Sequence, residues 1–168
     1  MRWFWIDRFT EFVRSQHAAA IKNIALDEEV VDEYQRGFPV LPPTLIVEGM
    51  AQLGGLLVSD HFRFEKRVVL AKVGRATFYA PARTGDQLAY RATIQQLHDT
   101  GATVSGTSHC DGNLQAEIDL MFAFLDEDKF IEGPLFNPRD LSSMLRMMGM
   151  YNNAVDCDGN SITMPEHI

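Results

Sequence analysis

The pattern of hydrophobic and polar positions first predicts a strand and a polar loop, followed by a long helix. Residues 12–26 alternate in the manner of β-structure, with the strand itself over residues 18–24. Residues 27–37 are acidic and polar, which indicates a loop or a short helix. The double proline at positions 42–43 fixes extended geometry and then opens a helix, because proline is tolerated in a first helical turn. The helix runs to about Asp60 and is apolar on every side, so it is expected to be buried.

A series of strands follows the helix. Predicted strands cover residues 68–79, 88–97, 102–110 and 114–125. The segments between them are rich in turn-forming residues, and Asp111-Gly112-Asn113 is typical of a tight hairpin. One long buried helix followed by an antiparallel meander predicts an α+β fold, with an antiparallel sheet wrapped around a central helix.

The tail of the chain carries a different pattern. Asn137 followed by Pro138 is typical of a helix N-cap with proline at the first helical position. A helical stripe follows at Leu141, Met144, Leu145, Met148 and Tyr151. The stripe favours a helix docked on the domain or on a partner subunit. The alternative is a flexible, methionine-rich cover over an apolar pocket.

Composition excludes several classes of protein. The length of 168 residues fits one domain, and a formal net charge of −8 argues against nucleic-acid binding. Cys110 and Cys157 lie far apart without metal-ligand spacing, which fits a reducing cytoplasm. No metal site and no cofactor are predicted. The N-terminus lacks the apolar core of a signal peptide, and no apolar stretch is long enough to span a membrane.

Glu48 is a lone carboxylate inside the apolar helix. An ionised carboxylate in such a place is costly unless something pairs with it or uses it. One interpretation is that Glu48 reaches a water-filled edge or pairs with an arginine. The other is a catalytic acid or base held in a dry pocket.

Five short segments of the chain form a recognisable set: Phe4-Trp5-Ile6-Asp7-Arg8-Phe9, Ala20-Ile21-Lys22-Asn23, Pro39-Val40-Leu41-Pro42, Glu48-Gly49-Met50-Ala51-Gln52 and Gly85-Asp86-Gln87-Leu88. In this order they resemble a known family, the beta-hydroxyacyl-acyl carrier protein dehydratases of type II fatty acid synthesis (FabZ- and FabA-like proteins). The resemblance covers about residues 3–126. It implies the hot-dog fold, with a dehydratase-like domain over residues 1–130 and a C-terminal extension over residues 131–168.

The resemblance also implies a catalytic arrangement. In the family, a histidine from the partner subunit takes the C2 proton, and a carboxylate on the central helix helps the 3-hydroxyl leave as water. Glu48 falls on the acid position, and Gln52, one turn later, is expected to orient Glu48 or to be a packing-edge amide. The implied substrate is a (3R)-hydroxyacyl thioester of acyl carrier protein or coenzyme A, bound by a homodimer or a higher homo-oligomer. The implied substrate-binding residues are Phe38, Pro43, Thr44 and Val47.

Two positions depart from the family pattern. The family histidine aligns with Tyr34, which has an ordinary pKa of about 10 and is a poor base at neutral pH. Tyr34 is therefore expected to be an aromatic wall of the acyl pocket, and His61 or His109 are the histidines that could approach the site. The glycine whose backbone N–H polarises the thioester carbonyl aligns with Pro43, which has no N–H. Thr44 offers the nearest substitute.

Three functions stay open at this point. The first is dehydration of a 3-hydroxyacyl thioester through Glu48, which would make the protein a hydro-lyase. The second is thioester hydrolysis, in which a helix carboxylate activates water and no histidine is required. The third is a degenerate homologue that binds acyl chains or pairs with an active partner. Docking of the acidic acyl carrier protein requires a basic patch, for which the candidates are Lys66, Arg67, Lys72, Arg75 and Arg83.

Overall fold

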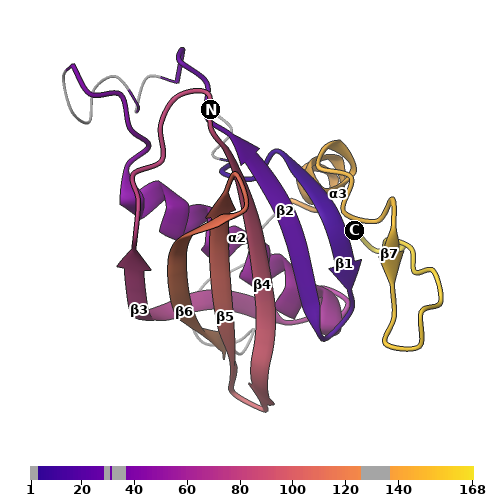
Figure 1. The fold of residues 1–168 in the computed structure, drawn as a ribbon. Helices are drawn as coiled ribbons and strands as arrows, with labels where there is room; N and C mark the ends of the chain where they lie inside the picture. Colours follow the sequence, from indigo (N-terminus) through magenta and orange to yellow (C-terminus); the bar gives the residue numbers. More distant parts are fainter. Residues whose placement is uncertain (1–3, 29–30, 32–36, 126–136) are drawn as a thin grey trace.

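An antiparallel sheet packs around one long helix in the computed structural model, which describes residues 4–28, 31, 37–125 and 137–168 (Figure 1). In chain order the elements are β1 (Arg8–Val13), β2 (His17–Asn23), α2 (Pro43–His61), β3 (Arg67–Phe78), β4 (Gln87–His98), β5 (Gly101–Cys110), β6 (Asn113–Leu125), α3 (Pro138–Met147) and β7 (Ala154–Val155). The sheet has the strand order β3-β6-β5-β4-β2-β1-β7, and all of its pairs are antiparallel except β1 with β7. The predicted α+β arrangement is confirmed.

The helix α2 crosses one face of the sheet and supplies the centre of the core (Figure 1). Met50, Leu53 and Leu57 are fully buried along it and meet the inward-facing side chains of the strands, such as Tyr90 and Leu120. Gly49 allows a close approach between α2 and its neighbours. A Cβ atom added to Gly49 would lie 2.7 Å from the Trp5 carbonyl oxygen and 2.9 Å from the Tyr90 ring, so only glycine fits.

The meander β3 to β6 follows the predicted boundaries within one or two residues. At the β5–β6 hairpin, Asp111 and Gly112 both have positive φ angles, 50° and 78°. Such a two-residue turn matches the right-handed twist of the flanking strands, and Asp-Gly is a favoured sequence for it.

The strand predicted over residues 18–24 is confirmed as β2, but β1, which precedes it, was not predicted. β1 and β2 form a hairpin whose turn contains Ser15 at a φ of 65°. A register shift between Phe9 and Glu11 interrupts the pairing, so the buried residues Phe9 and Phe12 are spaced by three. This irregularity breaks the alternation by which a strand is recognised in a sequence.

The C-terminal extension is joined to the sheet. Asn137 caps α3 as predicted, its side chain accepting a hydrogen bond from the Arg139 N–H at 3.0 Å. Leu145 is fully buried, and β7 adds to the edge of the sheet beside β1. The boundary proposed at residues 130/131 falls within 126–136, outside the described residues, so the division into a domain and an extension stays a prediction.

Within the part of the chain that the structure describes, no helix is long and apolar enough to cross a membrane. Both cysteines are free thiols, Cys110 half-buried and Cys157 exposed.

Candidate active site

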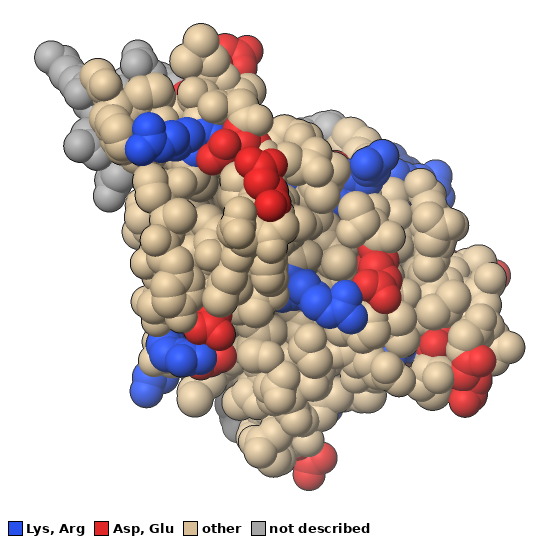
Figure 2. Space-filling view, viewed as in Figure 1, with Lys and Arg blue, Asp and Glu red and all other residues tan. Residues whose placement is uncertain are grey.

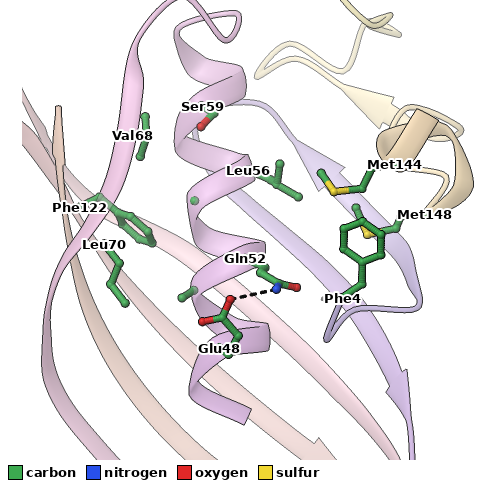
Figure 3. Close-up of a pocket in the computed structure, with 12 residues that line it drawn as sticks. Phe4, Glu48, Gln52, Leu56, Ser59, Val68, Leu70, Phe122, Met144 and Met148 are labelled. Atoms are coloured by element: carbon green, nitrogen blue, oxygen red, sulfur yellow. Dashed lines mark hydrogen bonds between the residues drawn. The ribbon is translucent and has the colours of Figure 1, made fainter. Parts of the chain in front are cut away.

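A groove of about 410 Å³ runs along one face of α2 (Figure 3). Its floor is the face of the helix that carries Glu48 at one end and Ser59 at the other. One wall comes from β3 and β6, and the opposite wall comes from the N-terminal segment, α3 and the C-cap residue of α3. The wall residues are Val68, Leu70 and Phe122 on the sheet side, and Phe4, Met144 and Met148 on the other. The lining is apolar apart from Glu48, Gln52 and Ser59.

Glu48 is held by a relay of two hydrogen bonds. The Gln52 side-chain nitrogen Nε2 donates to Glu48 Oε1 at 3.0 Å, and the backbone N–H of Trp5 donates to Gln52 Oε1 at 2.9 Å. Because a backbone N–H can only donate, it fixes the oxygen of the Gln52 amide toward Trp5 and the NH₂ toward Glu48. The N-terminal segment thereby orients the carboxylate through Gln52.

No cation neutralises Glu48 among the described residues, since none of their ion pairs involves it. The interpretation in which Glu48 pairs with an arginine is therefore wrong for this part of the chain. The carboxylate is half-buried and faces an apolar groove with an amide donor beside it. This environment leaves an oxygen of Glu48 accessible to a bound molecule.

The predicted substrate-binding residues do not all lie at this groove. Phe38 and Pro43 line a second, more open depression of about 350 Å³ at the start of α2. Thr44 is exposed in the first helical turn, and Val47 is partly buried against the core. Tyr34 lies outside the described residues, so its role and those of the other predicted site residues stay predictions.

The described histidines lie away from the groove, because none of them lines it. His61 stands at the far end of α2, where its Nδ1 is 2.7 Å from the Ser15 hydroxyl. His17 contacts Glu11 at 2.9 Å. His109 lies on β5 and does not reach the groove either. Among the described residues, no histidine therefore lines the groove that holds Glu48.

A second buried carboxylate, which the sequence analysis did not single out, anchors the other end of α2. Asp60 has 0% of its surface exposed and accepts two hydrogen bonds from the Arg14 guanidinium, at 2.7 and 3.1 Å. The Tyr151 hydroxyl also donates to Asp60. Its hydrogen bond to Asp60 raises the pKa of Arg14. Burial and, after it, the hydrogen bond from its own hydroxyl to Asp60 raise the pKa of Tyr151. Arg14 and Tyr151 are far from Asp60 in sequence, so no local pattern could have identified them.

Several residues of the predicted basic patch contact other side chains of the protein. Arg75 pairs with Asp119 at 3.0 Å, Lys66 lies 4.3 Å from the centre of the Phe62 ring, and Arg83 lies 4.4 Å from that of Phe38. On the face shown in Figure 2, blue and red groups are interspersed. Within the described residues, no cluster of His, Cys, Asp and Glu is arranged to hold a metal ion.

Comparisons with known proteins identify the family of the chain. Residues 3–119 match the model of the FabA-like domain family. The chain is 35% identical over 129 residues to a 3-hydroxyacyl-[acyl-carrier-protein] dehydratase FabZ of Campylobacter curvus, covering 73% of this chain and 87% of that relative. A FabZ of Thermomicrobium roseum is 32% identical over 124 residues, covering 73% and 83%.

Solved structures share the fold at low sequence identity. The dehydratase heterocomplex ApeI:P of Xenorhabdus doucetiae has a TM-score of 0.62 at 16% identity, covering 74% of this chain and 85% of that one. The smu.793 protein of Streptococcus mutans, bound to acetyl CoA, has a TM-score of 0.57 at 16% identity, covering 70% and 87%. The fold is therefore the hot-dog fold, and the chain belongs to the FabA-like family that includes the FabZ dehydratases.

Proposed function

We propose that the protein dehydrates (3R)-hydroxyacyl thioesters, carried by acyl carrier protein or coenzyme A, in fatty acid or related lipid biosynthesis in the cytoplasm. The observation that carries this proposal is Glu48 itself. It is an unpaired carboxylate within the described residues, oriented by Gln52, at one end of an apolar groove. The 30–35% identity to FabZ proteins along most of the domain supports the same reaction.

In the proposed reaction, Glu48 is the acid. A base removes the C2 proton, the C2–H electron pair forms the C2=C3 double bond, and the C3–O bond breaks. Protonated Glu48 gives its proton to the departing hydroxyl, which leaves as water. A positioned acid or base contributes about a hundredfold to ten-thousandfold in rate. Gln52 keeps Glu48 aimed into the groove through its contact with Trp5.

The base is proposed to come from a second copy of the chain. β3 has twelve residues and pairs with β6 on one side, which leaves its other edge open within the described chain. A long exposed edge strand is a template for pairing with another chain. Leu70 on β3 also lines the groove, so a copy paired along this edge would stand beside Glu48. Sedimentation equilibrium tests this step, and a monomer at micromolar concentration would contradict it.

Thioester hydrolysis is the second candidate. The absence of a described histidine at the groove favours it, because a carboxylate alone can activate water for attack on a thioester. A third possibility, a degenerate homologue that binds acyl chains or pairs with an active partner, is consistent with the departures at Tyr34 and Pro43.

Parallel product assays separate these functions. The purified protein is mixed with a 3-hydroxyacyl-coenzyme A, and enoyl thioester and free thiol are followed together, with Glu48→Gln as the control variant. Formation of enoyl thioester at a rate that falls at least a hundredfold in Glu48→Gln supports dehydration. Release of thiol with the same dependence on Glu48 supports hydrolysis. Neither product, with acyl binding retained, would refute both enzymatic functions.

A further inference from the structure

We infer that the C-terminal helix α3 sets the length of acyl chain that the groove accepts, with Met144 and the C-cap residue Met148 contacting the chain along one wall. This inference rests on the proposed function, because it takes Glu48 as the end of the groove where the thioester reacts. It adds a specificity determinant from a segment that lies beyond the residues matched to the FabA-like family, which end at residue 119.

The groove gives the acyl chain a single direction. From Glu48 its lining follows α2 toward the C-terminal end, through Ala51 and Gly55 to Ser59. Eleven residues at a rise of about 1.5 Å each give a path of about 16 Å. Ala51 and Gly55 keep this path open, and Gly55 lies over Phe122, whose ring would be 3.4 Å from an added Cβ atom. An aliphatic chain bound at Glu48 therefore runs along α2 with apolar surface on both sides.

The wall formed by α3 is firmly placed. The backbone N–H of Phe9 donates to the Met148 carbonyl at 2.9 Å, and Leu145 is fully buried beneath the helix. The Tyr151 hydroxyl fastens the following segment to Asp60. Met144 and Met148 project from this support toward the groove (Figure 3). Methionine is unbranched and adapts to irregular apolar partners, so a wall of this kind suits a flexible aliphatic chain.

A second copy of α2 is the competing occupant of this groove, and two observations favour the acyl chain. The volume of about 410 Å³ lies in the range of small-molecule pockets, about 300–1,000 Å³. The groove also begins at a carboxylate that has no cation among the described residues. Packing an apolar helix over Glu48 would bury that charge without compensation.

The test uses a matched pair of substitutions on neighbouring positions of α3. Met144→Trp narrows the groove, whereas Met147→Trp places the same side chain at a position that is 55% exposed and does not line the groove. The kcat/KM values of the full-length protein are measured with 3-hydroxyacyl-coenzyme A substrates of four to sixteen carbons. For Met144→Trp, the ratio for a twelve-carbon over a four-carbon chain is expected to fall about tenfold or more relative to Met147→Trp.

Several outcomes decide the inference. Identical chain-length profiles in the two variants would overturn it. A Met144→Trp variant that no longer self-associates in light scattering but keeps the wild-type chain-length profile would also overturn it. If Met144→Trp does not fold, Met144→Ala is used, which widens the groove and is expected to shift the preferred length upward.

Binding of saturated acyl-coenzyme A separates this inference from the proposed reaction, because such ligands cannot be dehydrated. Titration calorimetry with dodecanoyl- and butanoyl-coenzyme A is expected to show weaker binding of the longer chain alone in Met144→Trp. This result would support the acyl groove even if the wild-type protein formed no enoyl product. If Met144→Trp and Met147→Trp bind dodecanoyl-coenzyme A with the same affinity, and likewise butanoyl-coenzyme A, the groove assignment is refuted while the proposed reaction is unaffected.

Discussion

The two carboxylates of α2 that lie at its opposite ends have opposite surroundings. Asp60, near the C-terminal end, is completely buried and receives hydrogen bonds from Arg14 and Tyr151. Glu48, near the N-terminal end, is half-buried, accepts from the Gln52 amide and faces an apolar groove. A carboxylate that is neutralised and enclosed can hold a structure together but cannot reach a ligand. One that is oriented and left accessible is suited to chemistry, at some cost in stability.

The largest change in the free energy of unfolding is expected when the charge of Asp60 is removed. Asp60→Asn leaves the Arg14 guanidinium without its anion in a mostly buried site, which is expected to lower the free energy of unfolding by about 3–5 kcal/mol. Urea unfolding measures this change. Asp119→Asn is the control, because its partner Arg75 is exposed and such surface pairs contribute about 1 kcal/mol or less. Equal losses in the two variants would contradict the anchoring role of Asp60.

Tyr151 links the C-terminal extension to the same anchor. Tyr151→Phe removes a hydrogen bond to a charged acceptor, with an expected loss of about 1.5–3 kcal/mol at neutral pH. The folded state raises the pKa of Tyr151, by burial and by its bond to Asp60, so the folded protein holds this proton more tightly than the unfolded chain. The stability that Tyr151 contributes is therefore complete below pH about 10 and is lost as the pH rises above that value.

Unfolding at neutral pH and at pH about 11 tests the alkaline effect. The wild-type protein is expected to lose more stability between these conditions than Tyr151→Phe does. Tyr79→Phe serves as the control, because Tyr79 also donates to a carboxylate, that of Glu117, but is exposed just after β3. A parallel loss in the wild-type protein and Tyr151→Phe would show that Tyr151 is not responsible.

The elements that depend on a local sequence pattern could be predicted from the sequence. The apolar stretch after two prolines specifies α2 within about a residue, and strict alternation with Asp-Gly at a turn specifies the meander. β1 escaped prediction because the irregularity between Phe9 and Glu11 disrupts its alternation. Glu48 was recognisable because its neighbours are apolar, whereas Asp60, at the polar end of the helix, resembled an ordinary terminal residue.

The walls of the groove could not be predicted, because they depend on contacts between segments far apart in the chain. Phe4 and Met148 line the same groove because β1, through the Phe9 N–H, is hydrogen-bonded to the Met148 carbonyl of the C-terminal extension. The stripe of α3 allowed both a docked helix and a pocket cover, and the docked helix also lines the groove. The proposed base could not be identified from the sequence either, because the position that aligns with the family histidine holds Tyr34, which lies outside the described residues.

A smaller effect is expected at Gln52. Gln52→Leu removes the amide that joins Trp5 to Glu48 while keeping most of the side-chain volume. Misplacing a catalytic group lowers turnover more than substrate binding. We expect kcat to fall about tenfold, which is about 1.4 kcal/mol, with KM nearly unchanged. Steady-state kinetics measures both constants, and a rise in KM with an unchanged kcat would show that Gln52 contacts substrate instead of positioning Glu48.

The smallest effect, and the one that separates the two carboxylates most directly, is the stability of Glu48→Leu. If Glu48 is kept for chemistry, its half-buried charge lies beside apolar surface without a cation from the described residues, and an apolar side chain of similar size suits the position better. The free energy of unfolding is then expected to rise by about 0.5–1 kcal/mol while activity is lost. Urea unfolding resolves this difference when Glu48→Leu and Asp60→Asn are measured side by side. A substantial loss of stability in Glu48→Leu would mean that both ends of α2 are structural anchors, and the groove would then need another residue to act on its ligand.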